Sequence, residues 1–314
     1  MPYSLKDRLV VGVASSAIFN LEESDQVFKE KGEVEYRRYQ EQHLHVPLEK
    51  GISFSFIKRL LALNDLSPDP KEDPLIEVIL LSRNDPDTGL RVMKSIEYHE
   101  LAITRAIFLQ GKSPYQYIPA LNIALFLSGE KSDVVEAIER GLPAGYVMDS
   151  KIIDEDHDDS LRIAFDFDGV LADDESESVM QAEKLAAFHK NETHKVSEPH
   201  NPGPLKDFLV RIQKIQLAEE QKRQSEPSYT NRLRVSIVTA RNAPSHERAL
   251  NTLKNWGVLV NDAFFLGGID KGEVLKVLRP HIFFDDQTKH LESSSSVVPS
   301  VHIPFGVRNR DGEA

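Results

Sequence analysis

Two aspartates follow an apolar run in the second half of this 314-residue chain. The run Ile163–Phe165 is typical of a strand buried in a parallel sheet, and Asp166 and Asp168 come directly after it, with Gly169 behind them. Side chains alternate along a strand, so we expect both carboxylates on one side. Such like charges repel unless a cation or a proton relieves them. The spacing suits a catalytic site, and the alternative is a strand end with two solvated aspartates.

Further polar groups follow or open predicted elements later in the chain. They are Thr239-Ala240-Arg241-Asn242 after an apolar run, Lys271 at the start of a predicted helix, and Asp285-Asp286 after another apolar run. The carboxyl ends of strands in an open α/β sheet form the edge where ligands bind. We therefore expect these groups to meet Asp166 and Asp168 at one site.

This combination of side chains suits phosphoryl transfer through a carboxylate. Asp166 is the predicted nucleophile, whose attack on phosphorus would form an aspartyl-phosphate and divide hydrolysis into two steps. Asp168 is the predicted acid and base, which protonates the leaving alkoxide and then deprotonates water. Lys271 is expected to offset negative charge in the transition state, while Thr239 and the amides near Ala240 bind phosphate oxygens.

Mg²⁺ is the predicted cofactor, because it binds a few carboxylates together with phosphate oxygens and water. It would also relieve the repulsion between these acids and a dianionic substrate. The predicted ligands are Asp166, Asp168, Asp285 and Asp286. Arg241 and Asn242 are open to two interpretations, as clamps on phosphate or sugar, or as residues that cap the next helix.

The ordered set resembles the four-motif signature of haloacid dehalogenase (HAD) phosphatases. Within that superfamily, several segments look like cytosolic 5′-nucleotidase I: Phe165–Leu171 with Asp174–Glu177, Val238–Pro244, Phe283–Gln287 and, in the first half, Leu81–Pro86. The resemblance implies Mg²⁺-dependent hydrolysis of nucleoside 5′-monophosphates, such as AMP or IMP, to nucleoside and phosphate. It also implies the roles given above at the matched positions.

Two other functions fit parts of the same pattern. The substrate could be a sugar phosphate or another small phosphomonoester, with the same chemistry at Asp166. Alternatively, the chain could be a nucleotide-binding regulatory protein, because its first half lacks the acidic groups. A panel of phosphorylated metabolites separates these functions.

Alternating strands and helices predict an α/β fold with doubly wound parallel sheets. The two halves also resemble each other, since Leu161–Val179 can be laid on Leu9–Val27 at an offset of 152 (161 − 9) and later segments match at 157 or 158. We predict two HAD-like or Rossmann-like domains related by internal duplication, and chance similarity between βα units is the alternative.

The proposed copies differ at the positions that carry the chemistry. The first copy has Ala14, Ser16, Leu81, Pro114, Ser128 and Gly129 where the second has Asp166, Asp168, Thr239, Lys271, Asp285 and Asp286. We therefore predict a non-catalytic domain at 1–150 and a catalytic domain at 151–314.

The interval from Asp168 to Thr239 is longer than a single crossover needs. Helices are predicted at Asp173–Lys190 and Leu205–Lys222 within it. We predict that 173–230 is a small helical cap inserted in the second domain above the strand ends. The alternative is a pair of ordinary helices that cover the sheet.

Composition narrows the function classes further. The chain contains no cysteine, which excludes thiolate catalysis and disulfides, and its formal net charge of −12 disfavours nucleic acid polymers as partners. No apolar run reaches the length of a membrane span, and the start lacks the apolar core of a signal peptide. We expect a cytoplasmic protein with a nucleoside monophosphate as substrate and no membrane partner, and a homo-oligomer stays open.

Overall fold

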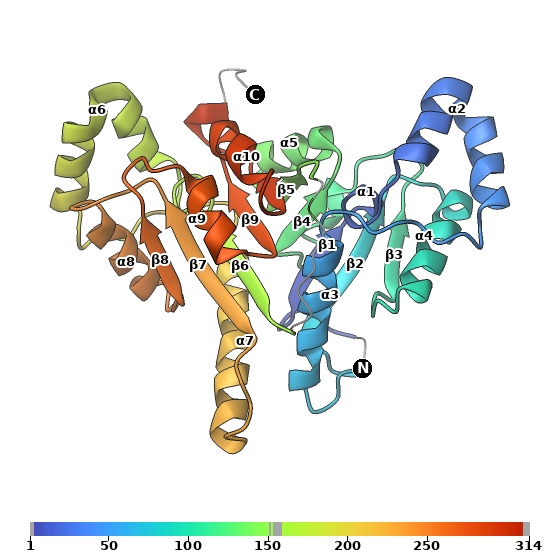
Figure 1. Ribbon diagram of the computed structural model, residues 1–314, viewed down its shortest axis with the longest axis horizontal. Coiled ribbons are helices and arrows are strands. Elements are labelled where there is room, and N and C mark those ends of the chain that lie inside the picture. The colour runs from blue at the N-terminus through green and yellow to red at the C-terminus, as the bar shows by residue number, and fades with distance from the viewer. Residues whose placement is uncertain (1–2, 151, 153–158, 310–314) are drawn as a thin grey trace.

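The computed structural model describes residues 3–150, 152 and 159–309 (Figure 1). The strands of the first half are β1 (Leu9–Val13), β2 (Ile76–Ser82), β3 (Arg105–Phe108), β4 (Leu125–Ser128) and β5 (Ala144–Val147). Those of the second half are β6 (Leu161–Phe165), β7 (Leu233–Thr239), β8 (Asp262–Phe265), β9 (Ile282–Asp285) and β10 (Ser300–His302). Together they form one sheet in the order β3-β2-β1-β4-β5-β10-β9-β6-β7-β8.

Helices connect the strands and cover the sheet. In the first half they are α1 (Ser15–Ile18), α2 (Glu22–Gln42), α3 (Phe54–Ala62), α4 (Pro86–Tyr98) and α5 (Lys131–Glu139). In the second half they are α6 (Glu175–His194), α7 (Lys206–Ser225), α8 (His246–Asn255), α9 (Lys271–Leu278) and α10 (Thr288–Ser294). Short 3₁₀ helices lie at Leu63–Leu66, Tyr115–Tyr117 and Val307–Asn309. Within the described ranges, none of the helices combines the length and the apolar character that a membrane crossing requires.

The strands within each half are parallel, and the two halves meet where β5 and β10 pair antiparallel. All residues of β1, β2 and β4 are buried, as the apolar runs predict for strands covered on both faces. The predicted α/β class with a mostly parallel sheet is confirmed. The predicted junction between residues 150 and 151 adjoins residues 151 and 153–158, which lie outside the described residues.

The same strand order occurs in both halves. β1 lies between β2 and β4, as β6 lies between β7 and β9. Leu9 pairs with Ile76 and Leu161 with Leu233, so the strands correspond at offsets of 152 and 157. This register makes Ser82 the counterpart of Thr239, so the expected counterpart Leu81 is wrong by one residue. The reason is that Arg83-Asn84 and Arg241-Asn242 lie in loops, whereas backbone hydrogen bonds set the strand offset.

The helices between β6 and β7 differ from the predicted cap. Phe208 of α7 packs with its ring centroid 6.1 Å from that of Phe165 and 6.2 Å from that of Phe284, so α7 covers the sheet. In addition, α7 begins 152 residues after α3, so the first half has a helix at the same place. The cap insertion is therefore wrong for α7. α6 is kinked like α2, and Figure 1 shows these two helices at opposite upper corners of the view.

Candidate active site

The carboxyl ends of β6 and β9 bring two predicted acids together. These strands are neighbours, and Phe165 pairs with Phe284, which places Asp166 and Asp285 side by side one residue later. The chain runs from β6 to β8 on one side and returns to β9 on the other, so this is a point where the strand order reverses. Ligands in open α/β sheets bind at such points.

Lys271 links the two acids. It is the first residue of α9, and its Nζ lies 2.6 Å from Asp166 Oδ2 and 2.7 Å from Asp285 Oδ2. All three side chains are buried. The structure thus joins three of the predicted site residues in one contact group.

Burial and charge act in opposite directions on these groups. Burial raises the pKa of Asp166 to about 6, with Lys271 opposing and Asp285 adding to the increase. Burial also favours the neutral form of Asp285, but Lys271 and His290 outweigh it and hold the pKa of Asp285 below its usual value. Although burial disfavours the ammonium form, the two carboxylates raise the pKa of Lys271. One lysine therefore faces two acids.

Asp286 adds a third acid to this buried site. Its Oδ1 is buried without a hydrogen-bond partner among the described residues. Burial, followed by the charges of Asp285 and Asp166, raises the pKa of Asp286 well above its usual value. Gly169, with φ +71°, passes so close that a Cβ there would lie 2.5 Å from Asp286 Cγ. An unpartnered carboxylate oxygen in a negatively charged pocket fits a bound cation.

The expected family is also supported by comparison of the whole chain with known proteins. A model of the 5′-nucleotidase family matches residues 1–310. The chain belongs to the 5′-nucleotidase family. Human cytosolic 5′-nucleotidase 1B is 33% identical over 298 residues, which make up 93% of this chain and 48% of the human protein. The chain spans about half the length of that relative, and its resemblance to the cytosolic 5′-nucleotidase I family is confirmed.

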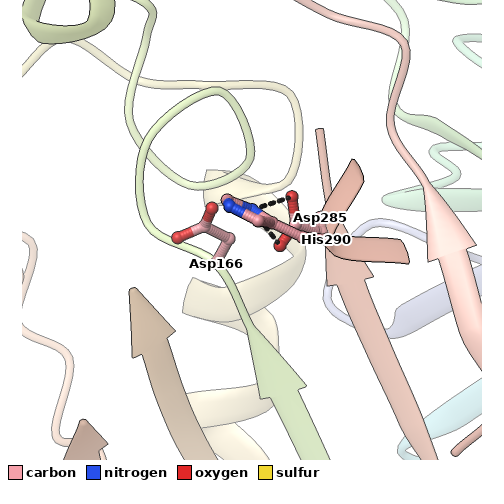
Figure 2. Close-up of side chains that lie close together, drawn as sticks. All are labelled: Asp166, Asp285 and His290. Atoms are coloured by element: carbon pink, nitrogen blue, oxygen red, sulfur yellow. Dashed lines mark hydrogen bonds and ion pairs between the residues drawn. The ribbon is translucent and has the colours of Figure 1, made fainter. Parts of the chain in front are cut away.

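His290 joins the acids at this site, although sequence reasoning missed it. Ligand atoms of Asp166, Asp285 and His290 lie within 4.8 Å of one another, and Figure 2 shows the three side chains together. The Nδ1 of His290 is 3.3 Å from each oxygen of Asp285. The available signal was the position of His290, five residues after Asp285, near the start of the helix that follows the strand.

Asp168 is held by an arginine that follows β7. Arg241 donates to both of its carboxylate oxygens, from Nε to Oδ2 at 2.7 Å and from Nη2 to Oδ1 at 2.6 Å. Arg241 is buried, and its Nη1 also donates to the carbonyl of Ser245, the residue before α8, at 3.1 Å. The structure thus gives Arg241 a role that neither sequence interpretation included.

The other predicted phosphate-binding residues lie near the end of β7. Thr239 is buried, and its Oγ1 accepts from the backbone N–H of Arg241 at 3.3 Å. Ala240 is exposed. The carbonyl of Asn242 accepts from Ser245 Oγ and from the N–H of His246, which supports the capping interpretation for Asn242.

A second group of ligand-type side chains lies nearby. Asp173, Glu175 and His200 have ligand atoms within 4.8 Å of one another. However, Glu175 already forms ion pairs with Lys195 and Arg248. Arginine and lysine therefore already balance its charge, unlike the charge of Asp286.

Proposed function

We propose that this chain hydrolyses nucleoside 5′-monophosphates through an aspartyl-phosphate on Asp166. The observation that carries the proposal is the buried group of Asp166, Lys271 and Asp285, followed by Asp286, whose Oδ1 has no hydrogen-bond partner within the described part of the chain. Family membership and the name of the human relative support nucleotides as the substrate class.

The reaction is proposed in two steps. A carboxylate oxygen of Asp166 attacks phosphorus, the bond from phosphorus to O5′ breaks, and Asp168 gives its proton to O5′ so that the nucleoside leaves as an alcohol. Water then attacks phosphorus and gives a proton to Asp168. The bond from Asp166 to phosphorus breaks, which releases inorganic phosphate and restores both acids.

Residues at the strand ends assist both steps. The ammonium of Lys271 counteracts negative charge as phosphorus is transferred, and the hydroxyl of Thr239 with nearby amides binds phosphate oxygens. The ion pair with Lys271 favours the ionised form of Asp166, as a nucleophile requires.

Mg²⁺ is the proposed cofactor. Asp166, Asp285 and Asp286 would hold it, since the excess of acids over Lys271 and the unpartnered oxygen of Asp286 both fit a divalent cation. When bound, it supplies positive charge that neutralises phosphate oxygens. Asp168 stays a proposed ligand, although Arg241 occupies both of its oxygens here.

Asp166→Asn tests the nucleophile. We expect kcat with AMP to fall by roughly 10⁴-fold or more, since removal of a nucleophile is among the most damaging active-site changes. Asp262→Asn, at the amino end of β8, is the matched control and should keep full activity. A panel of AMP, IMP and sugar phosphates with Mg²⁺ identifies the substrate class. Unchanged AMP hydrolysis by Asp166→Asn contradicts the mechanism.

We also propose that the halves are domains, 1–150 and 151–314, that arose by duplication. The shared strand order supports this origin, as do kinks with positive φ at Gly32 and Lys184, which are 152 residues apart. Of the predicted cap, we retain only α6. A cytosolic location is proposed from the name of the human relative.

A further inference from the structure

A chain of buried contacts connects α6 with the proposed acid and base. Arg241 holds Asp168 through two parallel hydrogen bonds, a geometry that sets both the position and the plane of the carboxylate. The orientation of Asp168 therefore depends on what holds Arg241.

Arg241 is itself held on three sides. Its guanidinium carbon lies 5.2 Å from the ring centroid of Phe167 and 5.3 Å from that of Phe188. Its third nitrogen, Nη1, forms an ion pair with Glu192. Phe188 and Glu192 both belong to α6, so this helix supplies a ring face and a charge to the guanidinium.

Glu192 is the anchor of this arrangement. Its side chain is fully buried and accepts from Ser176 Oγ at 2.8 Å and from Arg248 Nη1 at 2.9 Å. Its other oxygen meets Arg241 and lies 3.3 Å from His200 Nε2. A carboxylate with partners on both oxygens cannot move without breaking several buried hydrogen bonds, each of which is costly to leave unmade.

We propose that Glu192 is a positioning residue for the reaction. Through Arg241, Glu192 fixes the carboxyl group of Asp168 in the position from which it gives its proton to the leaving O5′. In this way α6 affects the chemical step without contacting the substrate. This inference rests on the proposed function. The positioning role accounts for the burial of Glu192, Arg241 and Arg248 beside the proposed catalytic acids.

The leaving group separates this role from a purely structural one. AMP needs a proton on O5′ as its bond to phosphorus breaks. Its analogue with sulfur in place of O5′ releases a thiolate, which leaves without a proton. Both substrates share the base, the sugar and the phosphoryl group. The ratio of their kcat/KM values therefore reports how well Asp168 donates its proton, because kcat/KM covers the steps up to release of the nucleoside.

Glu192→Gln is the test variant, since it keeps the shape of the side chain and removes its charge. We expect kcat/KM for AMP to fall roughly 10- to 100-fold, which is part of the roughly 10²–10⁴-fold that acid–base catalysis supplies. The kcat/KM for the sulfur analogue should stay within about threefold of the wild-type value. Asp168→Asn should show the same selectivity for the leaving group.

Glu219→Gln is the matched control. Glu219 is also fully buried, and it accepts from Tyr229 Oη at 2.7 Å and from the N–H groups of Arg232 and Leu233, at the amino end of β7. We expect it to lower stability without changing the ratio between the two substrates.

A double variant supplies a second measurement on AMP alone. If Glu192 acts through Asp168, Glu192→Gln should change kcat/KM by less than about twofold in the Asp168→Asn background, because the effects of residues acting as one unit do not multiply.

Equal losses on both substrates, unchanged activity of Glu192→Gln, or multiplied losses in the double variant would overturn the positioning role. Wild-type protein that hydrolyses neither substrate would instead overturn the proposed function.

Discussion

The two points where the strand order reverses have the same arrangement of strands but different side chains. At the ends of β6 and β9 lie Asp166 and Asp285, which both pair with Lys271, and Asp286 follows Asp285. Between β1 and β4 the counterparts of the acids are Ala14, Ser128 and Gly129. One of these counterparts makes a neutral contact, in which Gly129 N–H donates to Ser16 Oγ at 3.2 Å. The fold thus provides the same strand-end position twice, but the charged groups of the proposed phosphoryl transfer only once.

The first-half position remains hollow. A cavity of about 870 Å³ is lined there by Ser16 and Gly129, among others, and its charged lining residues are Glu22, Asp25, Asp149 and Lys50. This balance of three acids and one lysine matches that of Asp166, Asp285 and Asp286 with Lys271, so net charge alone does not distinguish the two positions. What distinguishes the second-half position is the placement of its cation, because Lys271 Nζ lies 2.6 Å from Asp166 Oδ2 and 2.7 Å from Asp285 Oδ2.

The largest difference between the halves is expected when the polar side chains at equivalent positions are replaced by alanine. Asp285→Ala should lower kcat with AMP by roughly 10²–10³-fold, because it removes a proposed metal ligand and a partner of Lys271. Ser128→Ala changes the counterpart in the first half and should leave kcat unchanged. Steady-state kinetics on both variants tests this, and a similar loss in Ser128→Ala would show that the first half takes part in catalysis.

The second test concerns metal binding at only one of the two positions. At free Mg²⁺ of 100 times its Kd, the free energy of unfolding of the wild type should rise by about 2.7 kcal/mol relative to protein in chelator. Ser128→Ala should keep this increase and Asp285→Ala should lose most of it. Urea unfolding with Mg²⁺ or chelator measures the difference, and an equal increase in both variants would place the ion elsewhere.

The comparison also shows what the sequence could predict. Apolar runs set the strands, so the expected meeting of Asp166, Lys271 and Asp285 at the strand ends is present in the structure. Glu192 was missed because a glutamate on a helix reads as a surface residue, and only tertiary packing buries it against arginines. The match of Thr239 to Leu81 was wrong because loop motifs, unlike strand pairing, tolerate a one-residue change in length.

The third prediction concerns the loss of stability caused by buried acids that the first half lacks. Asp286→Asn should raise the free energy of unfolding of metal-free protein by about 1–2 kcal/mol at pH 7 while it impairs catalysis, since active-site acids often reduce stability. The native pKa of Asp286 lies above its usual value of 3.8, so the wild type loses stability relative to the variant as pH rises above that value. Thermal unfolding from pH 4 to pH 8 tests this, and Ser128→Ala serves as a control whose difference from wild type should not depend on pH.

The smallest effect is expected at the two helix kinks. Gly32 has φ +78° and ψ −177°, and at the equivalent point of α6 Lys184 has φ +70° and ψ +178°, a region that suits only glycine. Lys184→Gly should therefore stabilise the protein by roughly 1 kcal/mol, because relief of about 1–3 kcal/mol of strain exceeds the entropy cost of glycine. Gly32→Ala should have the opposite effect, and since a Cβ there would meet nothing within 4 Å, only backbone strain is tested. Urea unfolding measures both variants, and a loss of stability in Lys184→Gly would show that the kinks of α2 and α6 are not equivalent.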